Sequence, residues 1–360
     1  RMETKKKFMG DHPLKQSNNQ SRVLFIGAVW PEPKSSAGGS RLMHLINLFI
    51  ENHFDVHYCS AASTTAYMSD LSSMGVTTFS IQLNNSSFEE AVKKLNPNVV
   101  IFDRFMVEEQ FGWRVAECCP TAIRIIETID LHCLRLARKE LLKLKEGATK
   151  NLKDVLKSSD VSKREIASIL RSDLSIMISV AEMQVLKEVF DVDDLRLFYL
   201  PFKAGERQKD VPSYDDRKGY MTIGNFKHAP NWDAVLQLKQ KVWPLIRKKQ
   251  KDAQLYVYGS YADDKVMQLH DEKNGFHLMG RAEDALEVMK NARVCLAPLR
   301  FGAGIKGKLV ESMMCGTPSV TTDVGAEGMK GSLNWNGMVE NDLTKFSDLA
   351  VELYANQTLW

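Results

Sequence analysis

The sequence has little of what marks membrane proteins, metal proteins and nucleic-acid binders. No apolar run reaches the length of about 18 residues that a membrane-spanning helix needs. The six cysteines show no metal-ligand spacing and most lie in apolar runs, so a reducing compartment, the cytoplasm, is expected. A net charge of +3 is too small to indicate a nucleic-acid surface. What remains is a globular chain in which 44% of the residues are hydrophobic.

The 360 residues suit two domains, and the sequence divides into two similar series. In each series short β-branched runs alternate with amphipathic helical stretches, which is typical of parallel sheets with helical crossovers. Residues 201–219 lie between the two series and contain two prolines and many charges, so they are predicted to be a linker. A charged stretch from residue 131 to about 170 is expected to be a solvated helical hairpin.

These patterns predict a chain of five parts. A disordered leader (1–21) precedes a Rossmann-like, doubly wound α/β domain (22–200). The linker (201–219) leads to a second Rossmann-like domain (220–340). The last part (341–360) is expected to be a C-terminal helix that the end of the sequence cuts short.

A glycine-rich stretch late in the chain, "RFGAGIKGKLVESMMCG" (300–316), indicates phosphate binding. Gly302, Gly307 and Lys308 fit the start of the phosphate-loop pattern of nucleotide triphosphatases. That pattern continues with Ser or Thr, whose hydroxyl holds Mg²⁺, but this sequence has Leu309 there. The stretch therefore predicts a phosphate site that needs no metal ion.

A helix that begins near Gly304 would strengthen this site. Small residues in its first turn expose backbone N–H groups, and the helix dipole favours an anion there, so a diphosphate can bind. Lys306 and Lys308 supply full positive charges, and Glu311, one turn further along, suits the hydroxyl groups of a ribose. The alternative is that Lys308 and Glu311 form an ordinary surface ion pair.

A second wall of the site is expected in the N-terminal domain. Ligands of open α/β sheets bind beyond the carboxyl ends of the strands, so two facing sheets would form a cleft between the domains. The first strand leads into "AVWPEPKSSAGGSR" (28–41), where Gly38 and Gly39 let the backbone approach a ligand and Ser40 is a candidate helix cap. A plain flexible loop explains the two glycines equally well.

Three segments of the C-terminal half carry a family resemblance: "GNFKHAPNWDAVLQLKQKVWPLI", "LYVYGS" and "FHLMGRAEDALEVMKNARVCLAPLRFGAGIKGKLVESMMCGTPSVTTDVGAEGM". In this order they resemble the donor-binding domain of the family 4 retaining glycosyltransferases, which have the GT-B fold. In the N-terminal half, "ETIDLHCLRLARKE" (127–140) and "ISVAEMQVL" are similar to the family more weakly. The resemblance implies a nucleotide-sugar donor bound by the C-terminal domain, an acceptor bound by the N-terminal domain, and no obligatory metal or other cofactor.

One position departs from the family pattern. Members commonly carry two Glu in this segment, the first contacting the sugar of the donor and the second its ribose. Glu311 occupies the second position, and Ala303 stands at the first. The sugar contact must then come from backbone N–H groups of residues 302–306 or from the N-terminal domain.

The resemblance also implies roles for other residues. Retaining transfer by front-face attack is expected, in which a leaving phosphate oxygen takes the proton of the acceptor. Helix capping is an alternative role for Asn231, and a solvated loop position is an alternative for Arg281. The candidate catalytic residues are Lys306, Lys308 and His132; the nucleotide sugar is expected to contact Gly280, Arg281, Arg300, Gly302, Ala303, Gly304, Ile305, Lys306, Lys308, Glu311, His228 and Asn231, and the acceptor Gly38, Gly39, Arg41, Asp103, Arg104 and Asp130.

Three other functions remain open. A phosphate-loop triphosphatase is disfavoured by Leu309. A sugar-nucleotide epimerase would act on the donor with no acceptor present. A catalytically silent nucleotide-sugar binding protein is kept open by Ala303. The epimerase and the binding protein would still bind a nucleotide sugar. The transferase would bind an acceptor as well, which is expected to be a glycan, a lipid or a small molecule.

Overall fold

A computed structural model describes residues 20–144 and 150–360. The predicted disordered leader lies outside these residues, apart from its last two. No helix within the described ranges is both long enough and apolar enough to cross a membrane.

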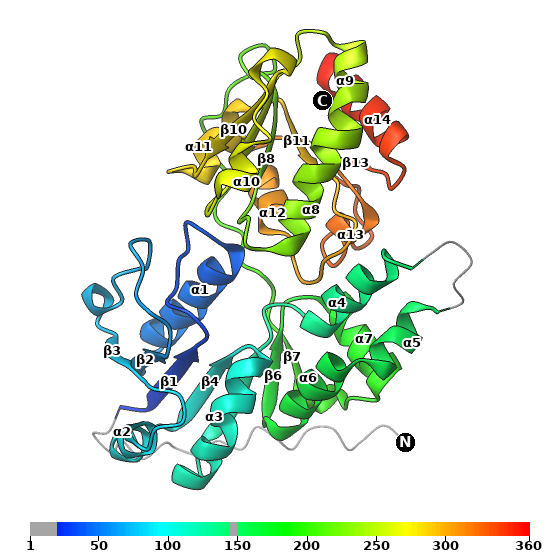
Figure 1. The fold of residues 1–360 in the computed structure, drawn as a ribbon. Helices are drawn as coiled ribbons and strands as arrows, with labels where there is room; N and C mark the ends of the chain where they lie inside the picture. Colours follow the sequence, from blue (N-terminus) through cyan, green and yellow to red (C-terminus); the bar gives the residue numbers. More distant parts are fainter. Residues whose placement is uncertain (1–19, 145–149) are drawn as a thin grey trace, which may run out of the picture.

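Two parallel β-sheets, one in each half of the chain, confirm the predicted α/β class with two doubly wound domains (Figure 1). The strands are β1 (Arg22–Gly27), β2 (Asp55–Ser60), β3 (Thr77–Ser80), β4 (Val99–Asp103), β5 (Ile123–Glu127), β6 (Leu174–Met177), β7 (Leu197–Tyr199), β8 (Tyr220–Ile223), β9 (Leu255–Tyr258), β10 (Phe276–Gly280), β11 (Val294–Ala297), β12 (Ser319–Thr321) and β13 (Gly337–Val339). The first sheet has the order β3-β2-β1-β4-β5-β6-β7, and the second has the order β10-β9-β8-β11-β12-β13.

Helices connect most of the successive strands. They are α1 (Ala37–Glu51), α2 (Ser87–Leu95), α3 (Phe105–Cys118), α4 (His132–Leu141), α5 (Leu152–Ser158), α6 (Asp160–Arg171), α7 (Val180–Phe190), α8 (Ala229–Gln237), α9 (Trp243–Lys249), α10 (Asp264–Met267), α11 (Ala285–Asn291), α12 (Gly307–Met314), α13 (Asp323–Ala326) and α14 (Leu343–Ala355). Short 3₁₀ turns lie at Ser72–Met74, Asp194–Arg196 and Glu272–Asn274, and a π-helical turn at Leu238–Val242 joins α8 to α9.

Strand β1 shows why the apolar runs of the sequence form the sheet centres. Leu24 and Ile26 belong to one buried cluster, and Val23 and Phe25 belong to another on the opposite face. Successive strand residues point to opposite faces, so a strand covered by helices on both faces is apolar throughout. The short edge strands β7 and β13 were not predicted from the sequence. In β7 only Leu197 is buried, and the residues of β13 are half-buried, so neither strand is a buried apolar run.

The prediction of a solvated hairpin over residues 131–170 is wrong. The described part of this stretch forms α4, α5 and α6, and the apolar sides of these helices are buried. Leu134, Leu156 and Ile169 belong to one cluster of the N-terminal core. Charged residues dominate the composition of this stretch because they cover the solvent-facing sides of three amphipathic helices.

Two helices of the predicted site begin at other residues than expected. Helix α1 begins at Ala37, and its cap is Ser36, whose Oγ accepts a hydrogen bond from the Gly39 N–H at 3.0 Å. Ser40 therefore does not cap the helix, and Gly38 and Gly39 lie in its first turn rather than in a flexible loop. Helix α12 begins at Gly307, so Gly304 belongs to the preceding loop, where its φ is +66°.

The segments that border the C-terminal domain pack more closely than expected. Residues 200–219 contain no helix or strand, but Arg217 is fully buried and donates hydrogen bonds to the Cys315 carbonyl and the Thr317 hydroxyl. Helix α14 ends at Ala355, and the Trp360 indole N–H donates to the Arg293 carbonyl at 2.8 Å. The expected continuous helix over 341–360 is therefore wrong at its C-terminal end.

The strand order places a binding crevice in each domain. In the first sheet the chain changes direction of winding between β1 and β4, and in the second between β8 and β11. Open α/β sheets bind ligands at these switch points, beyond the carboxyl ends of the strands. Figure 1 shows the C-terminal domain above the N-terminal domain, with α1 and α4 facing α8, α12 and α13 across the boundary between them.

Candidate functional site

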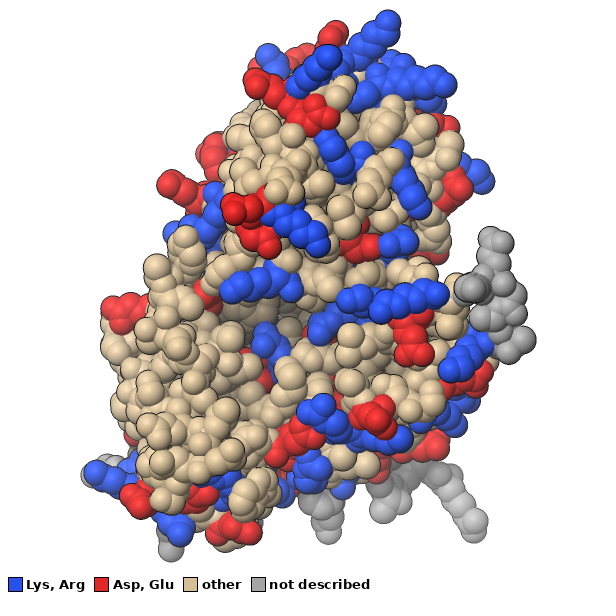
Figure 2. Space-filling view, viewed as in Figure 1, with Lys and Arg blue, Asp and Glu red and all other residues tan. Residues whose placement is uncertain are grey.

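A cavity of about 750 Å³ lies between the two domains. The N-terminal domain lines it with the loop after β1, the start of α1, and residues around Asp130. The C-terminal domain contributes residues 223–225, 227, 228, 230, 231, 282–286 and 301–308 together with Glu311. Lys and Arg side chains gather along the groove between the domains (Figure 2). The predicted cleft between two facing sheets is therefore present.

The N-termini of two helices meet at this cavity. The N-cap residue of α12, Lys306, makes no side-chain capping hydrogen bond, so the N–H groups of the first turn have no side-chain partner in the helix. A Cβ added at Gly307 would lie 2.8 Å from the Cβ of Ala37, which is the first residue of α1. Both helix dipoles therefore contribute positive potential to the same part of the cavity, and an anion is stabilised there.

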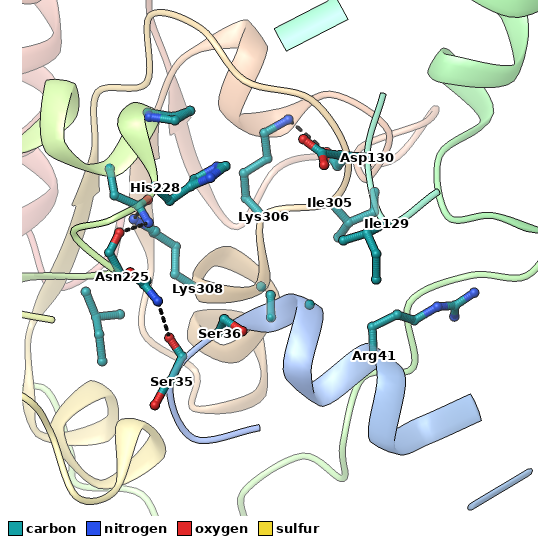
Figure 3. A pocket seen from close by; sticks show the side chains of 18 of the residues that line it. Ser35, Ser36, Arg41, Ile129, Asp130, Asn225, His228, Ile305, Lys306 and Lys308 are labelled. Atoms are coloured by element: carbon teal, nitrogen blue, oxygen red, sulfur yellow. Dashed lines mark hydrogen bonds between the residues drawn. The ribbon is translucent and has the colours of Figure 1, made fainter. Parts of the chain in front are cut away.

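Lys306 and Lys308 add charge at the same place. The Lys308 ammonium donates to Oδ1 of Asn231 at 2.9 Å, and the Lys306 ammonium donates to the Gly304 carbonyl at 2.9 Å. Figure 3 shows the Lys308 side chain beside His228 and the Lys306 side chain reaching toward Asp130. Burial, which disfavours the charged ammonium, lowers the pKa of each lysine to about 8.

Glu311 lines the cavity one turn into α12. Among the described residues its carboxylate has neither a hydrogen bond nor an ion pair, and Lys308 is bonded to Asn231 instead. The alternative of a surface ion pair between Lys308 and Glu311 is therefore wrong. Burial raises the pKa of Glu311, and the Lys308 charge opposes that shift. The carboxylate is left to accept hydrogen bonds from a ligand.

Three polar side chains of the segment after β5 form the opposite wall. The Asp130 carboxylate accepts a hydrogen bond from Arg135 and lies 3.3 Å from Nε2 of His132. Burial opposes ionisation of Asp130, but the hydrogen bond from His132 and the charge of Arg135 hold its pKa below the ordinary value. Across the cavity, burial lowers the pKa of His228 to about 4, so this imidazole is neutral at pH 7.

The other residues predicted to contact the acceptor differ in how close they lie to the cavity surface. Arg104 and Gly38 line the cavity, and a Cβ added at Gly38 would lie 3.2 Å from Nη2 of Arg104. Arg41 also lines it, but its guanidinium forms a buried ion pair with Glu127 at 3.2 Å. Asp103 lies behind the wall, where it accepts from the Ala28 N–H at 3.1 Å, so the prediction that it faces the cleft is wrong.

Four further predictions of site contacts do not fit this cavity. Arg300 points away and pairs with Asp233. Gly280 and Arg281 precede the lining residues 282–286, and the Arg281 guanidinium lies 4.3 Å from the ring centroid of Tyr67. Gly39 packs against the backbone of Glu32, where an added Cβ would lie 2.4 Å from a carbonyl oxygen.

Asn231 was predicted either to contact the nucleotide sugar or to cap a helix, and its hydrogen bonds show a different role. The N-cap of α8 is His228, so Asn231 does not cap the helix. Its Nδ2 donates to the Asn225 carbonyl at 3.0 Å while its Oδ1 accepts from Lys308. Asn231 therefore orients Lys308 in the cavity, and Asn225 in turn reaches the Ser35 carbonyl of the N-terminal domain at 3.4 Å (Figure 3).

Two residues that connect the two walls were not predicted from the sequence. Glu182 accepts a hydrogen bond from the Gly304 N–H, and Arg138 donates to the Gly302 carbonyl. Both lie in segments that resemble the family weakly, "ETIDLHCLRLARKE" and "ISVAEMQVL". That weak similarity was the only signal, because their partners are 122 and 164 residues away in the sequence.

The loop before α12 lacks the Mg²⁺-binding hydroxyl of a triphosphatase phosphate loop. Leu309, at the position where that pattern needs Ser or Thr, is fully buried. Within residues 20–144 and 150–360, no three His, Cys, Asp or Glu side chains lie close enough together to hold a metal ion.

Comparison with known proteins agrees with this geometry. Residues 217–356 match the family described as "Glycosyl transferases group 1". No curated protein matches the sequence. Among solved structures, sucrose-phosphate synthase from Thermosynechococcus elongatus is 14% identical, with a TM-score of 0.66 over 94% of this chain and 91% of that one. At such identity the similarity establishes the fold.

Two further structures contain UDP. Anabaena HepE, solved with UDP and glucose, is 10% identical, with a TM-score of 0.64 over 94% of each chain. Staphylococcus aureus TarM, solved with fondaparinux, alpha-GlcNAc-glycerol and UDP, is 17% identical, with a TM-score of 0.55 over 75% of this chain. The present chain spans only 52% of the TarM chain. Residues 217–356 therefore match a group 1 glycosyltransferase domain, and the chain as a whole has the two-domain GT-B fold of these structures.

Proposed function

We propose that the protein moves a sugar from a nucleoside-diphosphate sugar to an acceptor hydroxyl, with retention of anomeric configuration and without a metal ion. The observation that carries the proposal is the N-terminus of α12, which no side chain caps and which lies beside Lys306 and Lys308 in the cavity. This arrangement binds a diphosphate with N–H groups and ammonium charges. The UDP found in HepE and TarM supports a nucleotide donor. A cytoplasmic location stays a prediction.

The lining residues suggest how such a donor lies. The diphosphate binds at Gly307 and Lys308, and the ribose hydroxyls donate to Glu311. The sugar then faces the N-terminal wall at Asp130 and His132. The Ala303 methyl group packs against the buried cluster of the N-terminal domain, so it offers no contact to a sugar hydroxyl. Asp130, His132 and the glycine loop (301–306) are left to make that contact.

The proposed reaction needs no covalent link to the protein. The bond between the anomeric carbon and the phosphate oxygen breaks, and the acceptor oxygen forms its bond to the same carbon on the same face. The leaving phosphate takes the proton of the acceptor hydroxyl. Lys308 and the α12 N–H groups stabilise the charge that grows on the phosphate, while the two walls hold the reactants together.

A panel of nucleotide sugars tests the proposal. We expect one donor to yield free nucleoside diphosphate in the presence of an acceptor mixture, at a rate that EDTA leaves within about twofold. Release that stops in EDTA and returns with Mg²⁺ would refute the metal-free proposal. Conversion of the donor sugar without any acceptor would point to an epimerase, and tight binding without turnover of any donor to a silent binding protein.

The pH dependence of nucleotide binding tests the role of the lysines. Because the pKa of Lys308 and of Lys306 is about 8 in the free protein, each ammonium is charged at pH 7 and loses its proton as the pH rises. The affinity for UDP or GDP is expected to fall about tenfold between pH 7 and pH 9 for each lysine that must be charged. Titration calorimetry at both pH values measures this change. An affinity that stays constant would show that neither charge contributes.

A further inference from the structure

One carboxylate oxygen connects the two walls of the cavity. Glu182, in α7 of the N-terminal domain, is fully buried. Its Oε1 accepts a hydrogen bond from the Leu131 N–H at 2.8 Å and another from the Gly304 N–H at 2.9 Å. Leu131 directly precedes His132 on one wall, and Gly304 belongs to the glycine loop on the other. A single side chain therefore fixes the relative position of both segments.

The glycine loop is held by other contacts of the same kind. Arg138 donates to the Gly302 carbonyl at 2.8 Å and pairs with Glu327 of the C-terminal domain at 2.6 Å. Lys306, within the loop, donates to the Gly304 carbonyl. A Cβ added at Gly304 would lie 2.9 Å from the Cβ of Asp130, so the loop touches the N-terminal wall directly. The loop just before α12 is thus held by its own Lys306 and by side chains of the other domain.

We propose that Glu182 is a positioning residue that holds the glycine loop in the shape that binds the donor diphosphate, and does so only while the two domains are closed on each other. Glu182 does not line the cavity, so it acts through Gly304 and not by touching the nucleotide. The inference rests on the proposed function, because it assigns the diphosphate to the loop and to α12. It makes donor affinity depend on the N-terminal domain.

Two variants of Glu182 separate this role from simple packing. Glu182→Ala removes the shared acceptor oxygen, whereas Glu182→Gln keeps an amide oxygen at the same position and nearly the same volume. We expect Glu182→Ala to weaken UDP or GDP binding about tenfold in titration calorimetry and Glu182→Gln to restore it to within about threefold. Arg138→Ala, at a partly exposed position, should weaken binding in the same direction.

Glu165→Ala is the matched control. Glu165 is also a buried carboxylate of the N-terminal domain that accepts two backbone N–H groups at the start of α4, from His132 and Cys133, at 3.1 and 2.7 Å. These partners lie in its own domain. Its loss should lower the thermal unfolding temperature about as much as Glu182→Ala does, while nucleotide affinity stays within about twofold of that of the wild type.

Hydrogen–deuterium exchange of the nucleotide-free protein gives a second measurement. The peptide that covers 301–309 should exchange faster in Glu182→Ala and Arg138→Ala than in the wild type, and at the wild-type rate in Glu165→Ala. Unchanged exchange in Glu182→Ala, or faster exchange with unchanged nucleotide affinity, would overturn the inference. If exchange responds as expected but the wild type binds neither UDP nor GDP, then Glu182 does hold the glycine loop in place, and the proposed donor is wrong.

Discussion

Replacing Lys308 with Ala is expected to lower kcat about 100-fold while the affinity for the nucleotide sugar falls much less. The Lys308 ammonium lies in the first turn of α12, and its hydrogen-bond partner, Asn231, is neutral. Its charge is therefore available to a phosphate group. The charge on the leaving phosphate grows as the glycosidic bond breaks, so the ammonium stabilises the transition state more than it stabilises the bound donor.

Steady-state rates with the donor identified by the panel measure this effect, since they give kcat and KM separately. Lys290→Ala is the matched control, because Lys290 lies in α11 of the same domain, pairs with Glu287 and does not line the cavity. Its rate should stay within about twofold of that of the wild type. A Lys308→Ala enzyme with the wild-type kcat would remove this lysine from the reaction. Replacing Lys306 would be harder to interpret, because its ammonium also donates a hydrogen bond to the Gly304 carbonyl and its loss would change the loop as well as the charge.

Replacing Glu311 with Gln is expected to weaken binding of the nucleoside diphosphate about 10- to 100-fold. The Glu311 carboxylate lines the cavity and has no hydrogen-bond partner among the described residues, so both oxygens can accept from ribose hydroxyls. Hydrogen bonds to a charged acceptor are stronger than those to an amide, and the loss corresponds to about 1.5–3 kcal/mol. Folding stability should change little, because the substitution keeps the shape of the side chain.

Calorimetric titration with UDP and with GDP measures the loss of affinity. Glu287→Gln serves as the control, since Glu287 lies on α11, pairs with Lys290 and is absent from the cavity lining. Its nucleotide affinity should equal that of the wild type. Equal affinities for Glu311→Gln and the wild type, with whichever nucleotide binds, would contradict the ribose assignment.

The fold, and the glycine- and lysine-rich loop that lines the cavity, were predictable because both depend on local patterns. Strands such as β1 are covered on both faces and are apolar throughout, and the glycines and lysines of 300–308 lie close together in the sequence. The stretch that forms α4 to α6 was predicted to be solvated because charged residues dominate its composition, although each helix buries apolar residues. Their buried residues, among them Leu134 and Ile169, recur at helical spacing, which is typical of amphipathic helices.

The rest of the site depends on contacts between residues that are distant in the sequence. Arg300 does not line the cavity and pairs instead with Asp233, which lies 67 residues earlier in the sequence. The contact of Glu182 with Gly304 exists only when the two domains are docked, and no pattern within either domain encodes it. Spacing alone could therefore single out the loop at 300–308 as a candidate phosphate site, but not the side chains of the other domain that contact this loop.

A crystal structure of the protein with UDP bound tests whether the diphosphate of the donor binds at α12. We expect the diphosphate to lie at the N-terminus of α12, with phosphate oxygens within hydrogen-bonding distance of the Lys308 ammonium and of the backbone N–H groups of the first turn. We also expect the ribose hydroxyls to contact Glu311. A UDP molecule bound outside the cavity between the domains, or inside it with its phosphates away from α12, would contradict the account.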